Sequence, residues 1–193
     1  METIAATLYG LDIVLLISFQ FLNRDYPFFS HAISDYGVGK TAHLFKLYVL
    51  AGCIAAPLLA WQFWQAGPTL YPVAIPIYLL GVMLGRLAIG LFPNDVRGKP
   101  RTRAGQIHRA ATLLAFTCAY MTVVEATPLL SATVSGDLAL ALSVLKHLIS
   151  AGFIAVVLTV SAPLRRFFGL AERLFLYATA LWFLTASLTL PPL

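Results

Sequence analysis

Long runs of hydrophobic residues, separated by short polar segments, recur along the whole chain. Each run holds about 20 residues, the length that an α-helix needs to cross a hydrocarbon core about 30 Å thick. Run length and helix-breaking residues predict spans at about residues 3–22, 44–66, 71–92, 106–128, 137–162 and 170–190. The pattern therefore predicts an all-α fold: a polytopic transmembrane helical bundle of about six spans, formed as a single domain from residues 1–193.

Composition supports the same class. Of the 193 residues, 60% are hydrophobic and 11% are charged, whereas about a quarter of the residues in an average soluble domain are charged. A water-soluble fold of this length would leave much of that apolar surface exposed. We therefore expect a multi-pass membrane protein without a separate soluble domain.

The positions of the basic residues predict an orientation. Eleven of the thirteen lie in or beside the first, third and fifth loops, and the second and fourth loops hold none. Because basic loops face the cytoplasm, both termini are expected on the outer side of the cytoplasmic (inner) membrane. The net charge of +5 is explained by these loops, which face lipid headgroups, and we expect no nucleic-acid partner. The eleven residues are Arg24, Lys40, Lys46, Arg97, Lys99, Arg101, Arg103, Arg109, Arg165, Arg166 and Arg173.

Charged residues within the predicted spans are candidates for a ligand-binding site, since such residues usually pair or line a cavity. Asp12 and Lys146 lie at a similar depth below the outer helix ends, so we expect them to meet. The pair either joins helices one and five or lines a polar cavity together with His147. Arg86 is close enough to the inner end of its span for its side chain to approach the interface, although it remains a binding candidate.

Histidine and carboxylate side chains also gather on the predicted cytoplasmic side. His31, Asp35, Asp95 and His108 are candidates for a metal or acid–base site, which an intramembrane lipid hydrolase would need. His43 and His108 open two spans on the same side, an arrangement that can hold a haem. No tight metal motif accompanies either set, so the sequence assigns no cofactor and leaves open whether the protein is an enzyme.

Two glycines in the third span predict close helix packing. Gly81 and Gly85 have the small-xxx-small spacing that lets helix backbones approach each other. The expected role is packing between helices, and a homo-oligomer contact through the same face is the alternative.

Three short motifs give the chain a family resemblance. They are Ile33-Ser34-Asp35-Tyr36-Gly37 after the first span, Gly90-Leu91-Phe92-Pro93-Asn94-Asp95 at the end of the third, and His108 at the start of the fourth. In this layout the chain resembles the bacterial and archaeal membrane family called domain of unknown function 998. The resemblance implies a helical membrane architecture and assigns no activity. Turn formation and helix capping by these residues are the alternative to a substrate site.

The functional interpretation follows from the intramembrane charges. We expect a protein that binds, senses or moves a lipid or small amphiphile through a polar intramembrane cavity. The alternative is a metal-dependent or acid/base hydrolase that acts on a lipid at the cytoplasmic face.

Overall fold

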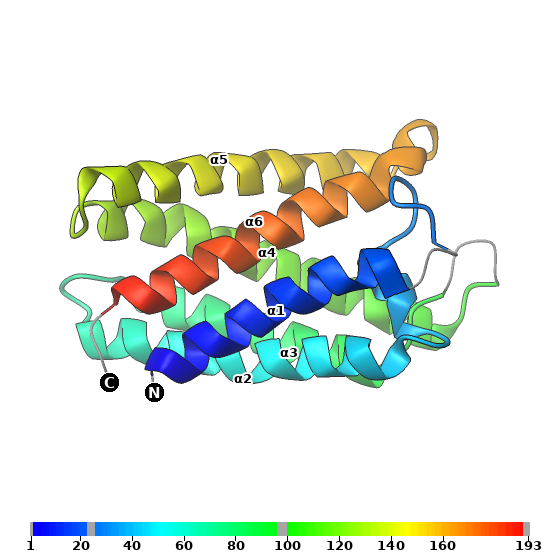
Figure 1. Cartoon of the computed structure of the whole chain (residues 1–193), viewed down its shortest axis with the longest axis horizontal. Coiled ribbons are helices and arrows are strands. Elements are labelled where there is room, and N and C mark those ends of the chain that lie inside the picture. The colour runs from blue at the N-terminus through cyan, green and yellow to red at the C-terminus, as the bar shows by residue number, and fades with distance from the viewer. Residues whose placement is uncertain (1, 23–25, 96–99, 191–193) are drawn as a thin grey trace.

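The chain folds into a bundle of α-helices, and the described residues contain no β-strand (Figure 1). The computed structural model describes residues 2–22, 26–95 and 100–190. Arg24, Arg97 and Lys99, which contributed to the predicted orientation, lie outside these ranges. The elements are α1 (Glu2–Leu22), η1 (Ile33–Gly37), α2 (Ala42–Ala66), α3 (Ala74–Leu91), α4 (Arg103–Ser131), α5 (Gly136–Thr159), η2 (Ala162–Phe167) and α6 (Phe168–Thr189), where η marks a 3-10 helix.

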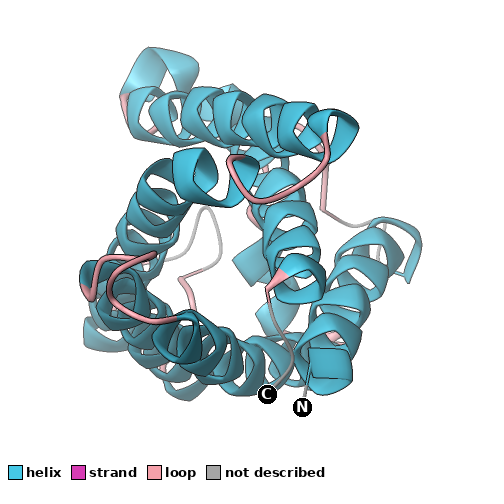
Figure 2. Cartoon of the chain, turned by 90° about the vertical axis from the view of Figure 1, so that its left-hand side faces the viewer, coloured by secondary structure: helices cyan, strands magenta, loops and turns pink. Residues whose placement is uncertain are grey.

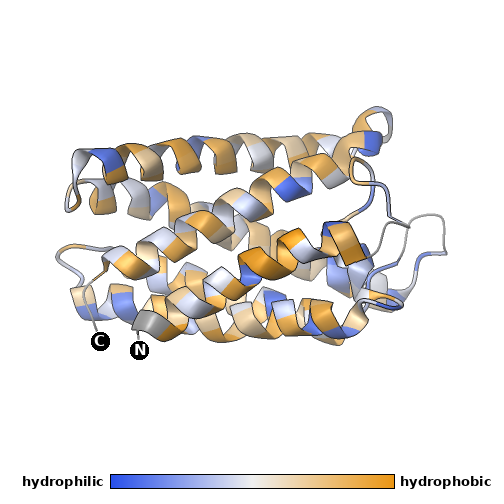
Figure 3. Ribbon diagram, viewed as in Figure 1, coloured by the Kyte–Doolittle hydropathy of each residue, from blue (hydrophilic) through white to orange (hydrophobic). Residues whose placement is uncertain are grey.

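All six α-helices are long and apolar enough to cross a membrane. Figure 3 shows hydrophobic residues along most of their length, with hydrophilic colour concentrated near the loops. The predicted class, a multi-pass helical membrane protein, is confirmed.

The helices pack as a ring. Each helix contacts the next one in the chain, and α6 closes the ring by packing against α1. Figure 2, viewed at 90° to Figure 1, shows the helices side by side in one bundle. Helices α1 and α5 do not contact each other, and α5 is the least buried of the six. The surface of α5 is therefore largely available to lipid.

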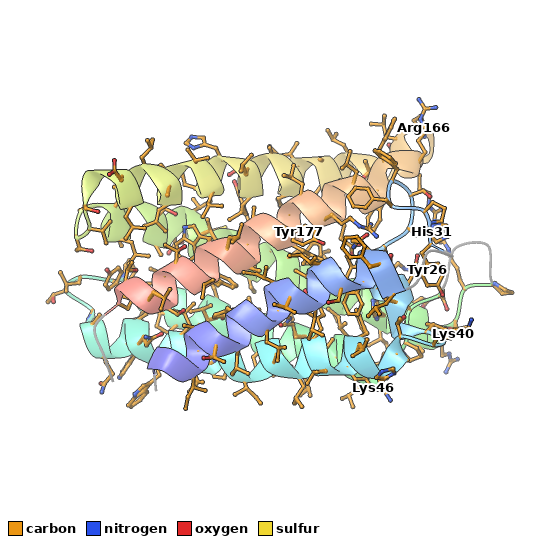
Figure 4. All side chains as sticks on the ribbon, in the orientation of Figure 1. Tyr26, His31, Lys40, Lys46, Arg166 and Tyr177 are labelled. Atoms are coloured by element: carbon orange, nitrogen blue, oxygen red, sulfur yellow. The ribbon has the colours of Figure 1, made fainter. Side chains whose placement is uncertain are left out.

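The two ends of the bundle differ in charge. The start of α1 and the end of α6 lie at one end, as expected for an even number of spans (Figure 1). Lys40, Lys46 and Arg166 lie at the opposite end, together with His31 and Tyr26 (Figure 4). We call this opposite end the basic end. Its assignment to the cytoplasm stays a prediction based on the positive-inside rule.

Local chemistry explains where the helix boundaries differ from the predicted spans. Helix α3 begins at Ala74 rather than near 71 because Gly67 takes a positive φ of 94° and Tyr71 N–H donates to its carbonyl in a turn. Helix α4 begins at Arg103, earlier than predicted, because the Thr102 side chain accepts a hydrogen bond from Gly105 N–H and caps it.

The two glycines of the third span pack within the chain. A Cβ atom added to Gly85 would lie 2.8 Å from Ala115 Cβ, and one added to Gly81 would lie 2.5 Å from Cys118 Sγ. Both contacts are on α4, so the predicted close helix packing is present. The homo-oligomer contact through this face stays a prediction, and α4 occupies the face in this structure.

Candidate functional site

A cavity lies inside the ring, and four of the buried polar side chains, Asp12, His108, Glu172 and Thr179, line it. It offers about 80 Å³ to the centres of water-sized molecules, several times the ~10–15 Å³ that one water needs by this measure. Helices α1, α2, α3, α4 and α6 line it, and η1 lines it at the basic end. Its polar lining residues are Tyr9, Asp12, Ser34, Tyr48, Arg86, His108, Thr112, Glu172 and Thr179.

Helical periodicity directs these side chains into the ring. On α6, Glu172, Phe175, Thr179 and Phe183 recur at intervals of three or four residues and all line the cavity. Residues at this spacing share one face of an α-helix. Mostly hydrophobic helices therefore carry a few polar groups on the face that is hidden from lipid.

An ion pair lies in the cavity wall. Arg86 Nη1 on α3 donates to Asp12 Oδ2 on α1 at 2.6 Å, and the two side chains are 13% and 3% exposed. Either charge alone would be costly at this depth, and pairing offsets much of that cost. The guanidinium carbon also lies 4.4 Å from the ring centroid of Tyr48, which adds a cation–π contact.

Gly52 makes the ion pair sterically feasible. Helices α1 and α3 are not neighbours in the ring, so Arg86 has to pass α2 before it reaches Asp12. It does so at Gly52, where an added Cβ would overlap the guanidinium. The glycine therefore gives the side chain a path across α2.

The predicted pairing of Asp12 with Lys146 is wrong. Helix α1 does not contact α5, and Asp12 bonds to Arg86 instead. Neither Lys146 nor His147 lines the cavity. His147 is exposed, and its Nδ1 lies 2.6 Å from the carbonyl oxygen of Ser143 in the same helix. The Arg86 side chain points into the bundle and pairs with Asp12, so it does not extend to the membrane interface as predicted.

The backbone fixes how His108 can act. Its Nδ1 lies 2.8 Å from the carbonyl oxygen of Phe92, which can only accept a hydrogen bond. Nδ1 therefore carries the proton, and in the neutral ring Nε2 is left as an acceptor. That nitrogen is buried and has no partner among the described residues. His108 thus offers the cavity one hydrogen-bond acceptor or proton-accepting atom.

Four polar atoms on the cavity-lining residues are buried without a hydrogen-bond partner in the described part of the chain: Tyr9 Oη, Asp12 Oδ1, His108 Nε2 and Thr179 Oγ1. They include a hydroxyl donor, a carboxylate acceptor and an imidazole acceptor. The rest of the wall is mainly apolar, with Phe116, Phe175 and Phe183. The cavity thus combines polar atoms that lack partners with an aromatic surface.

The residues of η1 cover the cavity at the basic end. Glu172 Oε2 accepts a hydrogen bond from Ile33 N–H at 2.5 Å, which ties η1 to α6. Asp35 is 3% exposed; its carboxylate accepts from Ala32 N–H at 3.1 Å and from Asn94 Nδ2 at 2.8 Å. Burial raises the pKa of Asp35, while the His31 charge and these hydrogen bonds oppose the rise. Asp35 therefore holds the turn together.

Asp95 has a capping role at the start of α4. Its carboxylate accepts from Thr102 N–H at 3.0 Å and from the Thr102 hydroxyl at 2.7 Å. These hydrogen bonds lower the pKa of Asp95 below its usual value, and the backbone hydrogen bond has the larger effect. The turn-forming and capping interpretation of Asp35, Asn94 and Asp95 accounts for their contacts.

The predicted histidine–carboxylate set does not form one centre. His31 Nδ1 lies 3.1 Å from Ser30 Oγ, and its ring stacks on Tyr26. Within the described ranges, no three His, Cys, Asp or Glu side chains are placed to share a metal ion. His43 is exposed and does not line the cavity that holds His108, so the two histidines do not share a haem site.

Sequence reasoning missed several cavity residues. Tyr9, Tyr48, Glu172 and Thr179 were not candidates. A signal was available for two of them: Tyr9 precedes Asp12 by three residues and so shares its helix face, and Glu172 is an acidic residue inside the sixth predicted span. Tyrosine and threonine are common in membrane helices, so the sequence provided no comparable reason to select Tyr48 or Thr179.

The fold and cavity define a multi-pass α-helical membrane protein with a polar pocket inside its helix ring. A family model described as "Protein of unknown function (DUF998)" matches residues 8–189, and the chain belongs to this family. The match covers α2 to α6 completely and most of α1. No similar protein was found among the curated proteins or among the solved structures.

Proposed function

We propose that this protein binds a small amphiphile, or the polar end of a lipid, in the cavity inside its helix ring. The observation that carries this proposal is the group of four buried polar atoms without partners in the lining of one cavity. An unsatisfied polar group costs free energy in an apolar interior, so a ligand that supplies hydrogen bonds would be stabilised there.

The chemistry of the wall suggests how such a ligand is oriented. A hydroxyl or amine of the ligand would donate to Asp12 Oδ1 or His108 Nε2, and an acceptor would bind the Tyr9 hydroxyl. The apolar part would pack on Phe116, Phe175 and Phe183. Ligand pockets commonly have this composition, with few polar groups in a mainly apolar wall.

Binding is better supported than lipid hydrolysis. A hydrolase would need a nucleophile or a metal-bound water beside its base. His108 Nε2 supplies a base, but no side chain in the described part of the chain is hydrogen-bonded to it, so no hydroxyl or carboxyl group is held against this base as a nucleophile. We therefore favour binding, sensing or movement of the ligand over a reaction.

A cavity-filling variant tests the proposal. Ala119→Leu adds three carbon atoms to a buried cavity residue, whereas Ala141→Leu makes the same change at an exposed position on α5. The full-length protein is purified in mild detergent with native lipid, and bound molecules are identified by native mass spectrometry. The parent protein and Ala141→Leu are expected to retain the same small amphiphile. Ala119→Leu is expected to bind it with an affinity at least about tenfold lower, which corresponds to roughly 1.4 kcal/mol of binding free energy.

Asp12→Asn gives a second readout. It keeps the shape of the side chain but removes the charge and replaces one acceptor oxygen by a donor. Folded Asp12→Asn protein is expected to bind the same ligand more weakly. Ligand retention that is equal in the parent protein, Ala119→Leu and Asp12→Asn would disprove the proposal.

A further inference from the structure

A second hollow lies on the outside of the bundle, between α5 and α6. It offers about 310 Å³ to the centres of water-sized molecules. Its apolar walls are formed by Leu145, Leu148, Leu170, Leu174, Ala178 and Leu181. None of its lining residues lines the internal cavity, so α6 separates the two spaces. We call this hollow the outer groove.

The outer groove has the length of one lipid leaflet. Its α6 wall extends from Leu170, near the basic end, to Leu181. At 1.5 Å per residue this is about 16 Å along the helix, roughly half of a hydrocarbon core about 30 Å thick. A lipid acyl chain from the leaflet on the basic side would therefore lie against these leucines.

Arg173 lines the groove near its basic end and forms no direct ion pair, although its charge interacts at longer range with Asp35 and Glu172. The side chain is 1% exposed. Its Nε donates to Gln20 Oε1 at 3.0 Å, and its Nη1 donates to the carbonyl oxygens of His31 at 2.7 Å and Gly169 at 3.0 Å. These acceptors are all neutral. Nη2 is buried without a hydrogen-bond partner, and no carboxylate oxygen in the described residues lies within 4 Å of the guanidinium.

We propose that the outer groove binds an anionic phospholipid, with one acyl chain along the leucine wall and the phosphate at Arg173 Nη2. The bond to the Gly169 carbonyl directs the guanidinium toward the basic end, where lipid phosphates lie. Phosphate oxygens accept charge-assisted hydrogen bonds from guanidinium groups. The exposed Arg165 and Arg166 lie in the last turn of η2, directly before α6, and add positive charge there. Figure 4 shows Arg166 at the basic end.

The test compares two lipids that differ in headgroup charge. Full-length protein in mild detergent is mixed with equal amounts of phosphatidylglycerol and phosphatidylcholine, and native mass spectrometry measures how much of each remains bound. A preference for phosphatidylglycerol of at least about tenfold is expected, the factor that a hydrogen bond to a charged group supplies. Arg173→Gln is expected to bind the two lipids almost equally.

Arg173 also bonds to the first loop, so its replacement could unfold the protein. A second pair of variants therefore leaves the arginine unchanged. Leu148→Trp fills the groove, whereas Leu140→Trp makes the same change on the same helix outside the groove. Leu148→Trp is expected to lose bound phosphatidylglycerol, and Leu140→Trp to keep it. Ala119→Leu, which fills the internal cavity, is also expected to keep it.

Three results would overturn the proposal. One is equal retention of both lipids by the parent protein. Another is an undiminished preference in folded Arg173→Gln. If Arg173→Gln does not fold, the comparison of Leu148→Trp with Leu140→Trp tests the proposal instead. Equal retention of phosphatidylglycerol by these two variants would exclude the groove as the binding site.

Discussion

The direction of one long side chain determines how charge is neutralised inside the bundle. Side chains on a helix tilt toward its N-terminus, so Arg86 extends from near the basic end of α3 back toward the middle of the bundle. There it meets Asp12 across Gly52. The sequence predicted Lys146 as the partner of Asp12 because the two residues lie at a similar depth along their spans. Depth alone takes no account of side-chain length or of which helices are neighbours.

We predict that Gly52→Ala destabilises the protein. The added methyl group would displace the guanidinium and leave Asp12 as a buried carboxylate without its partner. Loss of one partner of a buried ion pair typically costs about 3–5 kcal/mol. Thermal unfolding in detergent should therefore show a clear decrease in Tm for Gly52→Ala.

Gly10→Ala is the matched control. A Cβ at Gly10 meets no atom within 4 Å, and alanine is a better helix former than glycine by about 1 kcal/mol. Its Tm should be unchanged or slightly higher. Equal Tm values for the two variants would contradict the proposed path of Arg86 across α2.

At the scale of elements, the polar motifs of the first and third loops organise helix ends. Asp35 closes the η1 turn, Asn94 joins η1 to the segment after α3, and Asp95 caps the start of α4 through Thr102. The sequence predicted turns and caps at these residues because Asn, Asp and Ser accept backbone hydrogen bonds readily. It could not predict that Asn94 bonds Asp35, because that contact depends on how η1 and the segment after α3 lie beside each other in the fold.

The low pKa of Asp95 predicts how acid affects the start of α4. Its folded pKa is depressed, so its stabilising contribution is complete above its usual pKa of about 3.9 and is lost as the pH falls through the lower folded value. The Tm difference between the parent protein and Asp95→Asn should be constant from about pH 7 to pH 5 and should disappear in stronger acid. A difference that does not change with pH would show that the Asp95 charge does not stabilise this cap.

At the scale of the whole molecule, the helix ring creates the internal cavity. The six spans and their order followed from the sequence, because long hydrophobic runs have few other solutions in a membrane. The cavity did not follow, because Tyr48 and Thr179 are recognised as cavity residues only after α6 closes against α1. Lys146 and His147 were misplaced for the same reason, since the sequence did not show that α5 packs on the outside of α4 and α6.

The most direct test of the central claim is a high-resolution density map of the full-length protein, purified gently with its native lipid. We predict continuous non-protein density in the internal cavity, within hydrogen-bond distance of Asp12, Tyr9 or His108 and in contact with Phe175. The same molecule should be recovered by solvent extraction of the sample. A cavity filled only by separate ordered waters, with no small amphiphile in the extract, would contradict the account.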